Sequence, residues 1–371
     1  MKVFMLIAAG LLLADANAND LTLYGGICQD EANCNEQSQI EVIAKCKAHG
    51  VTVMMPSLSA DGRVLWKTDK LDYLPTMQAN LDKGYDALAV FIKHAHAAGL
   101  KVIPSIAVGP GGRILKEHPE WETRDRQGRP SSATVFTCIA YSYPAARAAK
   151  IAALMDLVND YDVDGVLLDY CRYPEHTTTP ETAYGYYGYD EPLLKACRQI
   201  YGFDPRQEPV DSANWKIFNA MRAESVTTFV REFREAIQRS GRKIRLCAFG
   251  DGDSGPEMEA RSCGRDYGTW CRRGLIDDFF MANYTTPIPK MTEVVQRVRQ
   301  AISPTVVLHS SLTPFQHFQK TNDEMVAAGK AQLAGGADGL WIYREDFLEQ
   351  LNLWAGAKSA RDLLIATRSK P

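Results

Sequence analysis

Residues 162–174, DVDGVLLDYCRYP, combine a short apolar run with an abrupt change to polar chemistry. Three aliphatic residues follow Gly165, the run ends at Asp169, and Arg172 and Tyr173 come directly behind it. A short apolar run between Gly and Pro is typical of a strand that is buried on both faces. Barrels of the α/β class keep their reacting groups at the carboxyl ends of such strands, so Asp169 is a candidate catalytic residue. The alternative is a structural ion pair between Asp169 and Arg172.

Strand and helix patterns alternate on both sides of this segment. The eight expected strands lie at about 21–28, 51–56, 100–108, within 162–174, and at 243–249, 276–284, 305–310 and 338–343. Apolar residues recur at helical spacing between them, and long polar connections occupy about 113–143 and 175–212. Eight such units predict a single (β/α)8 TIM barrel with long loops on its C-terminal face. A doubly wound open sheet is the alternative, but its usual G-x-G-x-x-G and P-loop motifs are absent.

The N-terminal segment and the composition limit where the protein acts and which partners it has. Residues 1–18 resemble a secretory signal peptide: Lys2 is followed by an apolar core, and Ala16-Asn17-Ala18 forms an A-x-A cleavage site. We therefore expect residues 19–371 to form the barrel, and the protein to be secreted or periplasmic without a membrane span. A formal charge of −3 gives no reason to expect a nucleic-acid partner. The sequence assigns no oligomeric state.

The nine cysteines give an odd count, which leaves at least one thiol unpaired. The pairs near enough in sequence to bridge loops are Cys28 with Cys34 and Cys263 with Cys271. The cysteines in or beside apolar runs, which we expect to be buried thiols, are Cys138, Cys171 and Cys247. No C-x-x-C pair occurs, so a structural zinc site is not expected.

Other polar and aromatic residues near the predicted strand ends should share a site with Asp169. The predicted substrate-binding residues are Arg172, Tyr173, Asp251, Asn283, Tyr284, His309, Trp341 and Tyr343. Rings, amides and carboxylates together suit a polyhydroxylated substrate, because rings cover apolar sugar faces and polar groups bond the hydroxyls. Glycosidic cleavage commonly needs a second carboxyl group. Our preferred candidate is Glu345, and the alternatives are Asp346, Asp251 and Asp253.

Signals for metal or cofactor chemistry are weak. His94 and His96 are two residues apart on a predicted helix, so they point to different sides and cannot easily share a metal ion. None of the expected strand ends carries a lysine for Schiff-base chemistry. We therefore expect no metal and no cofactor.

Five blocks together resemble the bacterial glycosyl-hydrolase-like family 10 proteins. They are YDALAVFIKHAHAAGLKVIPSI, HPEWETRDRQGRP, YDVDGVLLDYCRYP, WCRRGLIDDFFMANYT and GADGLWIYREDF, in order from Tyr85 to Phe347. The resemblance implies an exported TIM barrel that hydrolyses glycosidic bonds, with cell-wall glycans or other polysaccharides as substrates. It also implies that Asp169 is the acid at the end of the fourth strand. The chain departs from the pattern at Pro104-Ser105-Ile106, where a His and a Trp are expected.

The resulting hypothesis is an exported glycoside hydrolase that acts on a poly- or oligosaccharide. Asp169 would be the nucleophile or base, Glu345 the acid, and Arg172 the group that keeps Asp169 ionised. Two alternatives stay open on the same fold: a non-catalytic glycan-binding barrel and a metal-assisted hydrolase.

Overall fold

A computed structural model describes residues 20–25, 35–133, 136–175, 186–314 and 319–368. Its main sheet has nine strands in the order β5-β2-β1-β11-β10-β9-β8-β7-β6, and all neighbouring strands in it pair in parallel. The strands are β1 (Leu21–Gly25), β2 (Val53–Pro56), β5 (Lys101–Val102), β6 (Ser105–Ala107), β7 (Gly165–Asp169), β8 (Arg245–Asp251), β9 (Asp278–Ala282), β10 (Val307–Leu312) and β11 (Gly339–Tyr343). A small hairpin, β3 (Ser59–Ala60) with β4 (Arg63–Val64), follows β2.

The two edges of this sheet come from one predicted strand. β5 pairs with β2, β6 pairs with β7, and Pro104 lies between them. Proline has no N–H to donate to a ladder, so the regular pairing is interrupted there. A parallel bridge between Ser57 and Ser105 nevertheless joins the end of β2 to β6. The sheet is therefore closed around eight strand positions, which confirms the (β/α)8 barrel; the split of the third strand is the difference from the prediction.

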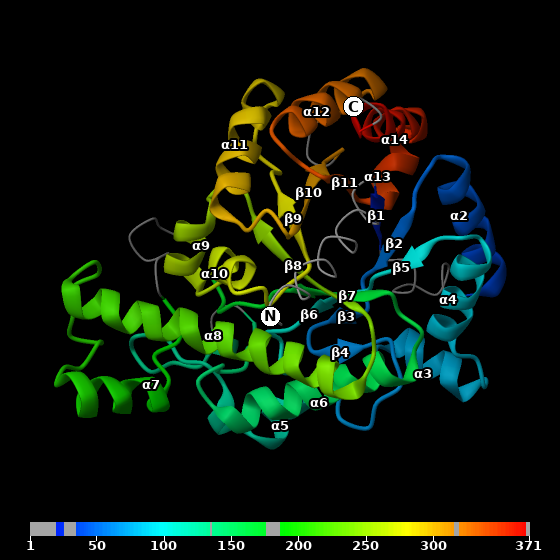
Figure 1. Cartoon of the computed structure of the whole chain (residues 1–371). Helices are drawn as coiled ribbons and strands as arrows, with labels where there is room; N and C mark the ends of the chain where they lie inside the picture. The colour runs from blue at the N-terminus through cyan, green and yellow to red at the C-terminus, as the bar shows by residue number, and fades with distance from the viewer. Residues whose placement is uncertain (1–19, 26–34, 134–135, 176–185, 315–318, 369–371) are drawn as a thin grey trace, which may run out of the picture.

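Helices surround the sheet on its outer side (Figure 1). They are α2 (Glu36–Ala48), α3 (Pro75–Asp82), α4 (Ala87–Ala97), α5 (Arg113–Glu117), α6 (Pro144–Asp160), α7 (Glu191–Ala196), α8 (Ala213–Ser240), α9 (Pro256–Cys263), α10 (Tyr267–Arg272), α11 (Ile288–Ala301), α12 (Asn322–Ala334), α13 (Glu345–Gln350) and α14 (Trp354–Arg368). Local sequence fixes several of their ends. Asp86 accepts a hydrogen bond from the N–H of Ala89 at the start of α4, and Thr321 forms a capping box with Glu324 at the start of α12.

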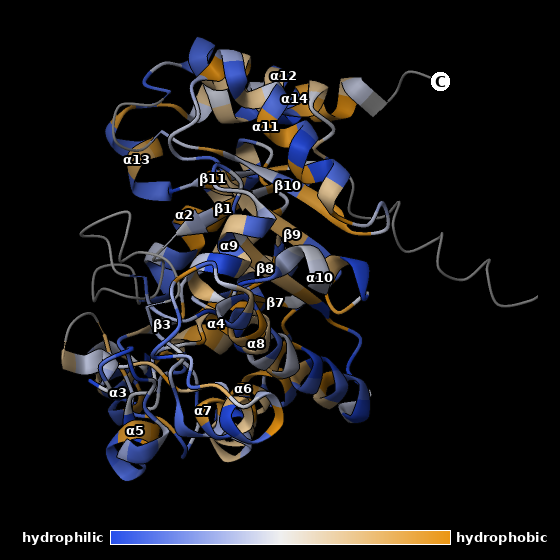
Figure 2. Ribbon diagram, turned by 90° about the vertical axis from the view of Figure 1, so that its left-hand side faces the viewer, coloured by the Kyte–Doolittle hydropathy of each residue, from blue (hydrophilic) through white to orange (hydrophobic). Residues whose placement is uncertain are grey.

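The core has an outer and an inner part. The outer part packs the helices against the sheet, and Figure 2 shows hydrophobic colouring concentrated on the central strands. The inner part fills the barrel and consists of Val53, Met55, Ile103, Leu167, Cys247, Phe280, Ala282 and Trp341. Because side chains alternate across a strand, the residues two positions beyond these point to the same interior. The inner core therefore forms a floor beneath the carboxyl ends of the strands.

The cysteine predictions are partly confirmed. Cys138, Cys171 and Cys247 are free and buried, as expected. The proposed bridge between Cys263 and Cys271 is wrong, since both are free buried thiols. Cys263 lies at the end of α9, where its thiol donates to the carbonyl oxygen of Glu259, while Cys271 is packed within α10.

Two predictions concern residues outside the described ranges. They are the signal peptide at 1–18 and the pair Cys28 and Cys34. Within the described ranges, every helix is too short or too polar to span a membrane.

Candidate active site

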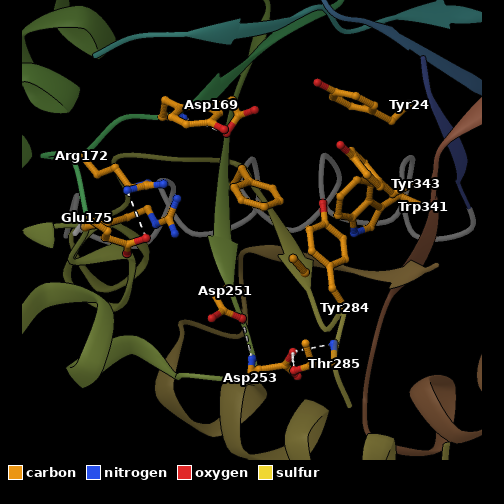
Figure 3. Close-up of a pocket in the computed structure, with 14 residues that line it drawn as sticks. Tyr24, Asp169, Arg172, Glu175, Asp251, Asp253, Tyr284, Thr285, Trp341 and Tyr343 are labelled. Carbon is orange, nitrogen blue, oxygen red and sulfur yellow. Dashed lines mark hydrogen bonds and ion pairs between the residues drawn. The ribbon is translucent and has the colours of Figure 1, made fainter. Parts of the chain in front are cut away.

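A cavity of about 440 Å³ lies above the inner core, at the carboxyl ends of the strands. This barrel-mouth cavity has two chemically different sides. Figure 3 shows Asp169, Arg172, Glu175 and Asp251 along one side and the rings of Tyr24, Tyr284, Trp341 and Tyr343 along the other. The position agrees with the expectation for a barrel of this class, in which the loops above the strand ends form the site.

Asp169 is the last residue of β7 and faces the barrel-mouth cavity. It lies two positions after Leu167 of the inner core, so strand alternation directs it to the interior. Its Oδ1 accepts a hydrogen bond of 2.7 Å from the N–H of Tyr170, which has a φ of 46° and so turns the chain away from the strand. Burial raises the pKa of Asp169 above its usual range, although that N–H and the charges of Arg265 and Arg172 oppose the effect.

Arg172 lines the cavity but is paired with a different carboxylate. Its Nη1 lies 3.2 Å from Oε2 of Glu175, and its guanidinium lies 5.1 Å from the ring centre of Tyr170. Among the described residues no ion pair joins Arg172 to Asp169. The predicted ion pair between Asp169 and Arg172 is therefore wrong, whereas the charge of Arg172 does favour the ionised form of Asp169, as the sequence-based hypothesis expected.

Arg265 and Glu259 were not identified from the sequence. Arg265 lines the cavity, its Nε donates to Glu259, and its guanidinium lies 5.4 Å from the ring centre of Phe249. Both charged residues are almost completely buried, at 4% and 2% exposure. They lie in and just after α9, between predicted strands, where no local pattern distinguishes them from surface charges. Their burial depends on how this connection packs over the barrel.

Asp251 and Asp253 both line the cavity at the end of β8. The Asp251 oxygens accept hydrogen bonds from the N–H of Asp253 at 2.9 Å and the hydroxyl of Ser254 at 2.5 Å. The Asp253 carboxylate accepts from the N–H and hydroxyl of Thr285, at 2.9 and 2.7 Å, and from the hydroxyl of Thr286. These bonds fix the orientation of both carboxylates.

The register between β7 and β8 sets the spacing of Asp169 and Asp251. Leu168 is opposite Ala248, so Asp169 is opposite Phe249 and Asp251 lies two residues further on the same face. With strands about 4.8 Å apart and a rise of about 3.3 Å per residue, the two Cα atoms are about 8 Å apart. Two carboxyl groups thus face one cavity with room between them.

The opposite wall is built from aromatic rings. Tyr343 lies between two other rings, with centroid distances of 5.1 Å to Tyr24 and 5.0 Å to Tyr284. The indole N–H of Trp341 donates to the carbonyl oxygen of Met281 at 2.9 Å, which fixes the ring at the cavity floor. Tyr284, Trp341 and Tyr343 were predicted together and are found together. Tyr24 was missed, although its place at the end of the first strand is a signal that could have found it.

Glu345 is not among the residues that line the cavity. It begins α13, on the outer side of the barrel near Cys46 of α2. The pKa of the Cys46 thiol is raised mainly by the burial of Cys46 and secondly by the negative charge of Glu345. The alternative Asp346 is paired with Arg344 at 2.7 Å. The structure therefore brings Asp251 and Asp253 to Asp169, and it does not bring Glu345 or Asp346 there.

Three predicted binding residues are buried away from the cavity. Tyr173 is fully buried, with the Arg222 guanidinium 5.2 Å from its ring centre. Asn283 is buried and accepts a hydrogen bond from the Ser311 hydroxyl. His309 is stacked on Phe280 inside the barrel, and its Nε2 lies 3.0 Å from Oδ1 of the buried Asp278. Their predicted positions at the mouth are wrong.

Within the part of the chain that the structure describes, one set of side chains has donor atoms near enough together for a metal ion. Oxygen and sulfur atoms of Glu175, Glu259 and Cys263 lie within 4.8 Å of one another. The guanidinium groups of Arg172 and Arg265 already pair with the two carboxylates. Positive charge is thus supplied by arginine at this cluster, and its donors do not match an open metal site.

Solved structures with the same architecture include several carbohydrate-active enzymes. α-L-Fucosidase isoenzyme 2 from Paenibacillus thiaminolyticus matches with a TM-score of 0.63 and 16% identity over 94% of this chain, which spans only 50% of the fucosidase. The catalytic domain of β-amylase from Paenibacillus polymyxa matches with a TM-score of 0.63 and 12% identity, covering 95% of this chain and 99% of that domain. A β-galactosidase from the psychrophilic Marinomonas ef1 matches with a TM-score of 0.62 and 12% identity, covering 94% of this chain and 59% of the galactosidase. At these identities the likeness establishes the fold alone.

Sequence comparison gives the family. No curated protein sequence is similar to this chain. The family model described as glycosyl hydrolase-like 10 matches residues 9–313, which is most of the chain and includes Asp169, Asp251 and the cavity wall up to Tyr284. The chain belongs to the glycosyl hydrolase-like 10 family.

Proposed function

We propose that this protein is an exported glycoside hydrolase that cleaves a poly- or oligosaccharide with Asp169 and Asp251 as its two carboxyl groups. The observation that carries the proposal is the barrel-mouth cavity itself, in which these carboxyl groups face a wall of aromatic rings. Rings stack on the apolar faces of sugars, and a carboxyl pair supplies the proton and the base that glycosidic cleavage needs. Membership of the family supports the same reaction.

The surroundings of the two carboxyl groups suggest their roles. Burial raises the pKa of Asp169, so its protonated form persists to higher pH and can protonate the leaving oxygen as a general acid. Both oxygens of Asp251 accept hydrogen bonds, an arrangement that suits the carboxylate anion and a general base. This assignment reverses the role expected for Asp169 from sequence, and it replaces Glu345 with Asp251.

The spacing of the pair suggests an inverting reaction. Two carboxyl groups about 5 Å apart form a covalent intermediate, whereas about 6.5–9.5 Å leaves room for a water molecule between base and sugar. The Cα atoms of Asp169 and Asp251 are about 8 Å apart on one face of the sheet, and we assign their carboxyl groups to the second class on that basis. Proton NMR of the first product formed would show the inverted anomer.

Activity of three variants tests the assignment. Asp169→Asn and Asp251→Asn should each lower kcat for reducing-end release by about 10²–10⁴-fold, the usual contribution of a general acid or base. The matched control is Asp160→Asn, which makes the same change at an exposed site at the end of α6. Full activity in either cavity variant would contradict the proposal. If the wild-type protein bound oligosaccharides but released no ends, the non-catalytic glycan-binding barrel would replace it.

Export is tested separately. The motif at Ala16-Asn17-Ala18 predicts cleavage before Asn19, so the full chain expressed in a bacterial host should yield a mature protein that begins there. Mass spectrometry of the periplasmic and medium fractions would measure this N-terminus. An uncleaved chain confined to the cytoplasm would contradict export without affecting the chemistry proposed for the cavity.

A further inference from the structure

Tyr170 combines an unusual backbone conformation with an exposed aromatic ring at the barrel-mouth cavity. It lines the cavity and is 41% exposed. Its φ of 46° lies in the left-handed region, which is unfavourable for a bulky side chain. The other described non-glycine residues with a positive φ are Asp61, Asp211, Gln319 and Asn352. Within the described part of the chain, Tyr170 is therefore the one aromatic residue in this conformation.

The turn at Tyr170 is held by backbone groups and does not need the ring. The N–H of Tyr170 donates to Oδ1 of Asp169 at 2.7 Å. Its carbonyl oxygen accepts from the N–H of Gly109 at 3.0 Å, the N–H of Arg172 at 2.9 Å and the hydroxyl of Tyr141 at 3.4 Å. A glycine would make the same backbone bonds without the unfavourable φ. The strain of a tyrosine at the edge of a cavity thus points to a role for its side chain.

Two neighbours hold the ring of Tyr170 in place. The Arg172 guanidinium lies 5.1 Å from the ring centre, and Glu175 fixes that guanidinium through an ion pair of 3.2 Å (Figure 3). Phe136 makes a T-shaped contact with a centroid distance of 5.8 Å. Because these contacts orient the ring before a ligand arrives, little conformational freedom is lost on binding.

The ring of Tyr170 shares the cavity with the aromatic wall. Burial is the main cause of the raised pKa of both Tyr284 and Tyr343, and the charge of Tyr170 adds to each shift. Charge interactions weaken with distance, so this coupling agrees with the position of all three residues around one cavity. The side of the cavity next to Asp169 therefore has an aromatic surface of its own.

We propose that Tyr170 is a sugar-stacking residue, whose ring binds one sugar unit of the glycan on the Asp169 side of the cavity. The inference rests on the proposed function, because that function makes the ligand a glycan. The apolar face of a sugar packs on a flat ring, and loss of such a ring weakens binding about tenfold. Since Tyr170 directly follows Asp169, the same turn places the stacked sugar beside the proposed general acid.

Calorimetric binding to the full protein tests the inference. The probes are cellohexaose, xylohexaose, maltohexaose and the hexamer of N-acetylglucosamine, and the variants are compared on the hexamer that the wild type binds most tightly. We expect Tyr170→Ala to weaken binding about tenfold and Tyr170→Phe to keep the wild-type affinity. Tyr170→Gly should weaken binding as much as Tyr170→Ala and, because glycine suits the φ of 46°, should melt at a higher temperature than Tyr170→Ala.

The matched control is Tyr201→Ala. Tyr201 is 49% exposed and does not line the cavity, so its loss should leave the affinity unchanged. Wild-type affinity in Tyr170→Ala and Tyr170→Gly, an equal loss in Tyr170→Phe or Tyr201→Ala, or a wild type that binds none of the four hexamers would overturn the inference. A lower melting temperature of Tyr170→Ala with unchanged affinity would do so too, because the ring would then be structural.

Reducing-end assays on the same mixtures report hydrolysis independently. Binding that depends on Tyr170, without release of reducing ends by the wild type, would support the inference and contradict the proposed hydrolase. Cleavage by the wild type together with wild-type affinity in Tyr170→Ala would do the reverse.

Discussion

Replacing Asp190 by Asn should stabilise the protein relative to wild type, by an amount that grows as the pH rises. Asp190 is 1% exposed and precedes α7. Its Oδ1 accepts hydrogen bonds from the Thr123 hydroxyl at 2.9 Å and the Arg124 N–H at 3.0 Å, and its Oδ2 accepts from the Ser142 hydroxyl at 3.1 Å. Burial outweighs these bonds and raises the pKa of Asp190 to about 6.

The sign and size follow from linkage. A carboxyl group whose pKa is raised in the folded state stabilises the fold fully below its unfolded pKa, and that stabilisation is lost as the pH rises through the folded pKa. For Asp190, with an ordinary value of 3.8 and a folded value of about 6, the whole loss is about 3 kcal/mol. About 1.4 kcal/mol of it falls between pH 5 and pH 8.

An asparagine can replace Asp190 without leaving these donors unpaired. Its Oδ1 keeps the bonds from Thr123 and Arg124, and its Nδ2 donates to the Ser142 hydroxyl, which turns to accept. The free energy of unfolding of the variant, relative to wild type, should therefore rise by about 1.4 kcal/mol from pH 5 to pH 8. Urea unfolding at both pH values measures it, with Asp160→Asn as the exposed control. A difference that does not change with pH would refute the reasoning.

Further outcomes are expected elsewhere in the molecule. If Asp169 is the general acid, kcat should fall as the pH rises through its raised pKa, and a pH–rate profile without that alkaline limb would contradict the role. Arg222→Met should lower the free energy of unfolding, measured with urea, by about 3 kcal/mol. The reason is that the buried guanidinium donates to the carbonyl oxygen of Tyr187 at 2.6 Å and to Oδ1 of Asn219 at 2.5 Å. Tyr343→Ala should weaken oligosaccharide binding about tenfold by calorimetry; unchanged affinity would exclude the ring wall as the sugar platform. The seven described thiols, all buried, should react with a thiol reagent only after denaturation, and fast reaction of the native protein would contradict their burial.

The fold was predictable because it depends on short-range patterns. Each strand is an apolar run bounded by breakers, and its period of two decides which side chains point inward. That pattern was enough to place Asp169 and Tyr343 inside the barrel near its mouth. It was not enough at Pro104, where a single imino acid divides one strand position between two edges of the sheet.

How far a side chain lies from the barrel rim was harder to predict than whether it points into the barrel. The sequence predicted that the seventh strand ends at residue 310, which put His309 at the mouth. The strand β10 continues to Leu312, three residues beyond His309, and at about 3.3 Å per residue this places the ring about 10 Å below the rim. His309 does point into the barrel, but it meets Asp278 in the floor. A boundary error of two residues therefore turned a structural residue into a predicted binding residue.

By itself, the sequence determined the barrel, the inward direction of Asp169 and three members of the ring wall, because strand periodicity and strand ends are local properties of the chain. Only the tertiary structure decided which charges are neighbours: Arg172 meets Glu175, Arg265 meets Glu259, and Asp251 rather than Glu345 shares the cavity with Asp169. Ion pairs between strand ends and the connections above them depend on how those connections return over the barrel. Packing of the whole chain fixes that return, and no local pattern encodes it.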